Sequence, residues 1–221
     1  MIDGPATVYL QYLFLCDWNF CSENKLQYEA NYFPQNFKTQ DIQNEVVQIV
    51  PSGPDSKLPV IFYSLMEAIG SAREKVLITS PYFIPGESLI DALIIVAKSG
   101  IEVKLLIPGV SDSKMVNAAA RSYYTEILQH GVRIFTYEKG FVHAKTMIID
   151  DDLSVVGSAN MDYRSFDLNF EVNAMLYSKE ITSQLQNAFE EDLKHSREIN
   201  ANDWLNRPRY IHLWEKLVRL L

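Results

Sequence analysis

A histidine and a lysine two residues apart are the side chains of this sequence best suited to chemistry. His143 and Lys145 lie in the run FVHAKTMIID, and a β-strand would turn both toward one face of a sheet. Burying an unpaired lysine among apolar neighbours is costly, so a purely structural strand explains the pair poorly. An anionic ligand would remove that cost. An imidazole can act as a nucleophile or a proton donor, and an ammonium can hold a phosphate as a point charge.

Further polar residues are spaced so that they could complete a phosphate site; they are Asp150, Gly157, Ser158, Asn160 and Glu171. Gly157 permits a tight turn, after which the hydroxyl of Ser158 and the amide of Asn160 are suitable partners for phosphate oxygens. Glu171 begins a later apolar run. A carboxylate bonded to one imidazole nitrogen of His143 would fix its tautomer and raise the reactivity of the other nitrogen.

Each part of this pattern has an ordinary structural explanation when it stands alone. A His-x-Lys pair on a strand is a weak signal, Asp150 is typical of a residue that ends a strand, and Gly-Ser-x-Asn is a common loop. Their joint occurrence in one order, with Glu171 28 residues after His143, favours a catalytic constellation.

From about residue 45, the apolar pattern alternates between strands and helices that would position these side chains. The predicted strands are 45–50, 75–79, 101–107, 132–137, 142–150, 154–156 and 171–177. The predicted helices are 60–72, 86–99, 111–129, 181–198 and 210–221. Such alternation predicts an α/β domain with a mixed, mostly parallel sheet and helices on both faces. The acidic pair Asp151-Asp152 is predicted to turn the chain between two of the strands.

The first 36 residues do not fit this alternation. They contain a predicted helix at 6–20, and residues 6–18 match residues 181–193 at five of thirteen aligned positions. One explanation is chance similarity between two amphipathic helices. The other is that residues 1–36 are the end of an earlier copy of the same domain, with residues 37–221 forming a second, complete copy.

Composition narrows the possible partners and compartments. The formal net charge of −8 counts against a general DNA or RNA partner, so none is expected. Two cysteines, Cys16 and Cys21, provide neither a zinc site nor a disulfide framework. No apolar run reaches the roughly 18–20 residues of a membrane span, and the start does not resemble a signal peptide, so the fragment itself is expected to be soluble.

The pattern His-x-Lys-x4-Asp-x6-Gly-Ser-x-Asn resembles the signature of the phospholipase D superfamily, and Glu171 matches the glutamate that orients its histidine. Pro51-Ser52-Gly53-Pro54, Ser80 to Pro85 and Asn169-x-Glu171 further resemble bacterial cardiolipin synthases. The resemblance implies phosphodiester chemistry without a metal or other cofactor. It also implies two motifs across a pseudo-twofold interface, with one histidine attacking phosphorus and the other protonating the leaving oxygen.

The resemblance implies phosphatidyl transfer between two phosphatidylglycerol molecules, which gives cardiolipin and glycerol. In that scheme His143, Lys145, Asp150 and Glu171 are catalytic, and Lys145, Ser158 and Asn160 bind the phosphate. The second motif would come from a first repeat of the same polypeptide or from a homodimer mate. The full-length enzyme would act at a membrane surface, on the cytoplasmic side of the bacterial cell membrane.

Two other functions remain open. A single-motif, homodimeric phosphodiesterase or nuclease of the same superfamily would share the chemistry, although the acidic charge counts against it. A degenerate copy that only binds anionic lipid or a partner is the second, but it has no need for His143, Lys145, Asp150 and Glu171 together.

Overall fold

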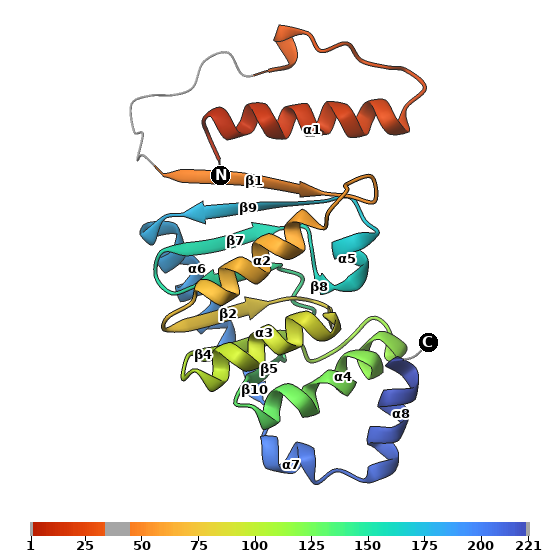
Figure 1. Ribbon diagram of the computed structural model, residues 1–221, viewed down its shortest axis with the longest axis vertical. Helices are drawn as coiled ribbons and strands as arrows, with labels where there is room; N and C mark the ends of the chain where they lie inside the picture. Colours follow the sequence, from red (N-terminus) through yellow and green to blue (C-terminus); the bar gives the residue numbers. More distant parts are fainter. Residues whose placement is uncertain (1, 34–44, 220–221) are drawn as a thin grey trace.

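The computed structural model describes residues 2–33 and 45–219, which form an α/β fold around one large sheet (Figure 1). In the described part of the chain, the order of the eight strands across this sheet is β1-β9-β7-β6-β2-β4-β5-β10. Their bounds are β1 Val46–Ser52, β9 Glu171–Tyr177, β7 Leu153–Gly157, β6 Thr146–Ile149, β2 Lys75–Thr79, β4 Glu102–Pro108, β5 Arg133–Tyr137 and β10 Ser196–Glu198. A small second sheet pairs β3, Phe83–Ile84, with β8, Met161–Asp162.

The predicted α/β class and mixed sheet are confirmed, with parallel pairing at the centre. β4 runs parallel to β2 on one side and to β5 on the other. The remaining neighbours in the described sheet are antiparallel, so parallel pairs are fewer than the sequence predicted. The reason is local: the turn at Asp151-Asp152 folds β7 back on β6 as a hairpin, and β9 and β1 continue that antiparallel arrangement.

Helices cover both faces of the sheet, as predicted. On one face lie α2 Val60–Ser71, α3 Gly86–Lys98 and α4 Lys114–Gln129, and on the other lies α6 Lys179–Leu193. Strand β2 shows how the sequence serves both layers, because successive side chains point to opposite faces. Val76 and Ile78 belong to the larger core with α2 and α3, whereas Leu77 packs with Phe189 of α6.

Two groups of helices lie at opposite ends of the molecule (Figure 1). At one end α1, Pro5–Cys21, lies beside β1 and is followed by a short 3₁₀ helix, Ala30–Tyr32. At the other end α7, Ala201–Leu205, and α8, Arg209–Arg219, pack on α4. The expected domain boundary between residues 36 and 37 lies outside the described residues.

Element bounds depart most from the prediction at two places. The helix predicted at 181–198 ends at Leu193, because Ser196–Glu198 form the strand β10 against β5. The strand predicted at 142–150 is reduced to β6. The register pairs Thr79, the last residue of β2, with Thr146, so the residues before Thr146 have no partner on that side. In the described residues, no helix combines the length and the apolar character needed to cross a bilayer.

Candidate active site

His143 lies in the irregular segment that leads into β6. The segment is tied to the sheet because the amide of Gly157 donates to the carbonyl of Lys145 at 3.2 Å. The imidazole of His143 is exposed, with its ring centroid 6.5 Å from that of Tyr82 and 5.4 Å from that of Phe141. These aromatic rings limit where the imidazole can point while leaving it open to a substrate.

Lys145 is half-buried beside two carboxylates without an ion pair of its own. Its ammonium donates to the carbonyl of His143 at 3.0 Å, and none of the salt bridges among the described residues involves it. Burial lowers the pKa of Lys145, and the negative charges of Glu171 and Asp162 oppose that shift. A partly desolvated cation without a paired anion is suited to a phosphate group.

Glu171 is close enough to Lys145 to act on its charge, but it does not hold the imidazole. Its carboxylate accepts from the side-chain amide of Asn169 at 3.1 Å. Among the described residues no hydrogen bond joins Glu171 to His143, so the predicted tautomer-fixing contact is absent from this structure. Glu171 instead lines a pocket of about 470 Å³ with Ser158 and residues of α1.

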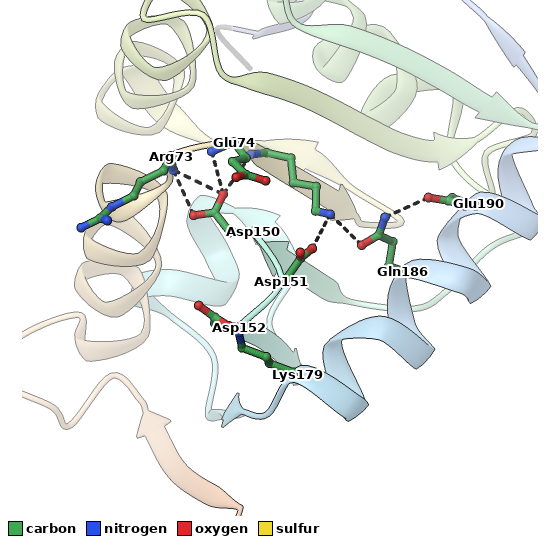
Figure 2. Close-up of polar contacts among 9 residues, drawn as sticks. Arg73, Glu74, Asp150, Asp151, Asp152, Lys179, Gln186 and Glu190 are labelled. Atoms are coloured by element: carbon green, nitrogen blue, oxygen red, sulfur yellow. Dashed lines mark hydrogen bonds and ion pairs between the residues drawn. The ribbon is translucent and has the colours of Figure 1, made fainter.

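Asp150 lies at the other end of β6, away from His143 and Lys145. Five residues of extended chain correspond to about 16 Å. Figure 2 shows its carboxylate facing the turn between α2 and β2, where it accepts from the backbone amides of Arg73, Glu74 and Lys75 at 2.8 to 3.3 Å. These contacts place Asp150 where it positions the backbone; they give no support to the catalytic role that the motif predicted, which stays a prediction.

Burial raises the pKa of Asp150, but the amides of Lys75, Glu74 and Arg73 together lower it below its usual value. Asp150 also adopts φ 50°, a left-handed conformation that aspartate and asparagine tolerate better than most residues. This geometry explains an aspartate at the end of the motif without assigning it a role in the chemistry.

The loop Gly157–Asn160 is fixed by buried side chains from neighbouring elements. A Cβ atom at Gly157 would lie 1.9 Å from Oδ1 of Asn173, which also accepts from the amide of Ala159 at 3.4 Å. The hydroxyl of Ser165 accepts from both the backbone amide and the side-chain amide of Asn160, at 3.1 and 3.2 Å. The loop conformation is therefore set before any ligand binds.

Asn160 and Ser158 differ in their freedom to bind phosphate. The Nδ2 atom of Asn160 uses one of its two N–H groups on Ser165, so the other can donate to a phosphate oxygen, whereas the buried Oδ1 atom is only an acceptor and has no hydrogen-bond partner within the described structure. The hydroxyl of Ser158 accepts from the amide of Val172 at 2.9 Å, and its own amide donates to the carbonyl of Val172 at 2.9 Å. Ser158 is thus hydrogen-bonded to β9, although its side chain stays exposed.

A pocket of about 390 Å³ lies beside Asn160. It is lined by residues in or next to the β3–β8 pair, the start of α4 and the helix α5, Tyr163–Asp167, including Tyr82, Asp112, Val116, Asp162 and Asn169. The phenol of Tyr82 donates to Asp112 at 2.6 Å, and this bond raises its pKa. The ring of Tyr82 also meets that of His143 edge-on, so the same tyrosine lines the pocket and lies next to the exposed imidazole.

The structure brings His143, Lys145, Asn160 and Glu171 to one end of the sheet and leaves Asp150 at the other. Sequence reasoning did not single out Asn173 or Ser165, which fix the loop. Asn173 lies two residues after Glu171 and therefore shares its face of β9, a signal that was present. Ser165 offered no such signal, because its contact with Asn160 depends on the turn into α5.

Comparison with known proteins adds a family to this geometry. The family model described as "Cardiolipin synthase, PLD-like domain" matches residues 65–193. The chain is 41% identical over all of its 221 residues to "Cardiolipin synthase 1" of Staphylococcus aureus and 40% identical to "Cardiolipin synthase" of Listeria monocytogenes. It spans 44% and 45% of the length of these two relatives.

Two solved structures share the fold at low sequence identity. Nuc, a phospholipase D family member from Salmonella typhimurium, has a TM-score of 0.60 and 20% identity, over 71% of this chain and 99% of Nuc. Phosphatidylserine synthase of Haemophilus influenzae has a TM-score of 0.62 and 15% identity, over 80% of this chain and 46% of that one. At these identities the likeness concerns the fold alone.

Proposed function

Because the chain belongs to the family of cardiolipin synthase PLD-like domains, we propose that it supplies one of two catalytic motifs for phosphatidyl transfer between two phosphatidylglycerol molecules. The products are cardiolipin and glycerol. The observation that carries this proposal is the exposed imidazole of His143 together with the partly desolvated, unpaired ammonium of Lys145, which donates to the backbone carbonyl of the same histidine. An imidazole with an adjacent cation is suited to displacement at a phosphate.

The reaction divides one displacement into two. One histidine of a pair attacks phosphorus of the first phosphatidylglycerol, and its P–N bond forms as the P–O bond to glycerol breaks. The other histidine donates a proton to the departing glycerol oxygen. It then takes a proton from the hydroxyl of the second phosphatidylglycerol, whose oxygen displaces the first histidine from phosphorus. His143 is one member of this pair, as nucleophile or as acid and base.

The surrounding residues act on charge and position. Lys145 and the remaining N–H of the Asn160 side-chain amide would donate to the phosphate oxygens, on which negative charge gathers in the transition state. Ser158 contributes to phosphate binding through its exposed side chain. The negative charge of Glu171 favours the charged form of Lys145, and Asp150 holds the end of β6 in register. No step in this scheme needs a cofactor.

The second motif comes from a first repeat of the same polypeptide or from a second copy of this chain. On the domain division expected from the sequence, α1 belongs to the preceding repeat and residues 37–221 form the second. The relatives are more than twice as long as this chain, which leaves room for another repeat. In such an enzyme the site faces phospholipid at the cytoplasmic side of the bacterial cell membrane.

A transfer assay on a polypeptide of the relatives' full length tests the proposal. We expect His143→Ala and Lys145→Ala each to lower cardiolipin formation from phosphatidylglycerol by at least about 10²-fold, because each removes a group that acts on the transferred phosphate. Circular dichroism and thermal unfolding should match the unmodified enzyme, since His143 is exposed and Lys145 has no ion pair.

Lys139→Ala is a matched control, because Lys139 lies in the same segment but contacts His195 at 2.9 Å. It should retain transfer. Full activity of His143→Ala would refute the proposed role of the imidazole. Degradation of DNA by the unmodified protein, without cardiolipin formation, would favour the nuclease alternative.

A further inference from the structure

Helix α8 turns its acidic residue inward. The carboxylate of Glu215 is buried at 3% exposure and accepts from Arg121 of α4 at 2.9 Å and from Arg207 at 2.9 and 3.0 Å. Near the end of the helix, the guanidinium of Arg219 lies 4.0 Å from the ring centroid of Tyr123. The helix is thus attached to α4 through charged groups as well as through the buried Val218, whereas the usual contact face is apolar throughout.

The outer face of α8 is apolar instead. Its exposed side chains are Tyr210 at 72%, Leu213 and Trp214 at 61% and Leu217 at 51%. Positions spaced by three, four and seven residues lie on one stripe of a helix, so these four side chains form one patch. A contiguous apolar patch with aromatic residues marks an interaction surface more often than a plain solvated face. We call it the α8 patch.

The charges around the α8 patch favour an anionic partner. Glu215 is the one acidic residue of the helix sequence RYIHLWEKLVR, and it points inward. Arg209 and Lys216 are exposed at the edge of the patch. The outer surface of α8 therefore presents cations without carboxylates, although the chain as a whole carries a formal charge of −8. Exposed tryptophan and tyrosine with neighbouring basic residues are typical of helices at a bilayer surface.

The place of α8 in the fold also favours lipid over a preceding repeat. Figure 1 shows α8 and α1 at opposite ends of the molecule, and the expected division assigns α1 to the preceding repeat. A neighbouring repeat would then lie at the α1 end. In contrast, α8 packs on α4, whose first residues line the pocket beside Asn160. Docking α8 on a bilayer would bring the substrate pocket toward the lipid.

We propose that the α8 patch docks on the surface of an anionic phospholipid bilayer, with its apolar side chains in the interfacial region and Arg209 and Lys216 at the headgroups. This inference rests on the proposed function, because it names the surface from which that site takes its substrate. The helix lies in the plane of the membrane and does not cross it.

Vesicle co-sedimentation of the 221-residue chain tests the docking. Vesicles of phosphatidylglycerol and phosphatidylcholine are compared with vesicles of phosphatidylcholine alone. We expect binding to the first and markedly weaker binding to the second. The double variant Leu213→Glu/Leu217→Glu should bind the anionic vesicles at least about tenfold more weakly, because two carboxylates replace apolar side chains that would enter the interfacial region of the bilayer.

The matched control is Leu58→Glu/Ile95→Glu, since Leu58 is 57% and Ile95 64% exposed outside α8. It adds the same charge and should bind anionic vesicles like the unmodified chain. Equal loss in both double variants would show that net charge alone decides binding, and would overturn the proposal. Unchanged binding of the α8 variant would overturn it as well.

A second measurement on the same variants distinguishes lipid binding from self-association. Sedimentation velocity without vesicles should give the same mass for the α8 variant and the unmodified chain. A dimer that disappears in the α8 variant, without an effect on vesicle binding, would show that a second copy covers the patch.

His143→Ala distinguishes this inference from the proposed function. It should bind vesicles normally, because the imidazole lies outside the α8 patch. Normal vesicle binding by the unmodified full-length enzyme, without any cardiolipin formation, would contradict the proposed function and leave the docking inference intact.

Discussion

Asp150 shows how one motif can combine residues with different tasks. Its position five residues after Lys145 groups it with the reacting residues in the sequence, yet its carboxylate binds three backbone amides at the far end of β6. Those amides belong to residues 75 to 77 positions earlier in the chain. No local pattern could have revealed them, because the contact exists only once β2 and β6 are paired.

Substitution of Asp150 should therefore lower the free energy of unfolding rather than act directly on the transfer reaction. We expect Asp150→Ala to destabilise the chain by about 2–4 kcal/mol, since it leaves three amides without their acceptor and places alanine at positive φ. Asp150→Asn should cost less, because asparagine tolerates this φ and keeps one acceptor oxygen. Urea unfolding measures both. Asp151→Asn is the control, because Asp151 is an exposed partner of Lys75 and should change stability by less than about 1 kcal/mol.

The lowered pKa of Asp150 has a consequence for acid stability. A carboxylate whose pKa is lower in the folded state stabilises the fold above its unfolded pKa, near 3.8, and that contribution is lost as pH falls through the lower folded value. The stability difference between the unmodified chain and Asp150→Asn should thus be constant above about pH 5 and shrink as the pH falls below it. Urea unfolding from about pH 6 to about pH 3 provides the measurement. A difference that stays constant would show that the carboxylate charge is not what the amides stabilise.

At the scale of elements, the sequence predicted the order of strands and helices well because periodicity is a local property. The strands 75–79 and 171–177 were predicted with the bounds that the structure shows. What could not be predicted was where a strand loses its neighbour. The segment with His143 and Lys145 continues the apolar alternation of β6, but β2 has already ended at Thr79. The candidate catalytic pair is consequently outside the sheet.

The close contact between β7 and β9 explains why glycine occupies position 157. A Cβ atom there would lie 1.9 Å from Oδ1 of Asn173 and 2.6 Å from the carbonyl oxygen of Val172, so side-chain movement alone could not accommodate it. We expect Gly157→Ala to destabilise the chain by about 2–3 kcal/mol. Gly70→Ala is the matched control, because nothing lies within 4 Å of its added Cβ in α2. It should stabilise the helix by up to about 1 kcal/mol.

Thermal and urea unfolding of the two glycine variants would separate local crowding from a general response to added methyl groups. Equal effects at both positions would contradict the role assigned to Asn173. In the full-length enzyme, Gly157→Ala should also lower transfer, because the loop that carries Asn160 would shift.

The whole molecule contains one imidazole at the candidate site. The sequence has four histidines, and in the described structure the other three are engaged elsewhere. His130 contacts the carbonyl of Glu126 at 2.7 Å, His195 contacts Lys139 at 2.9 Å, and His212 lies 3.5 Å from Thr125. The sequence predicted that this chain supplies one histidine of a pair, because it contains a single motif. It could not predict how a second motif is placed, since that depends on a surface outside this chain.

A mechanism that needs two histidines makes activity depend on association. We expect the isolated 221-residue chain to be inactive as a monomer. If two copies associate and form a two-motif cleft, transfer per chain should rise with protein concentration and reach a plateau when the dimer is complete. The measurement is cardiolipin formation across a concentration series, with the mass of the species followed by sedimentation. The His143→Ala chain is the control and should stay inactive at every concentration. Constant activity per chain in a preparation that remains monomeric would mean that one imidazole suffices, and the two-motif mechanism would have to be abandoned.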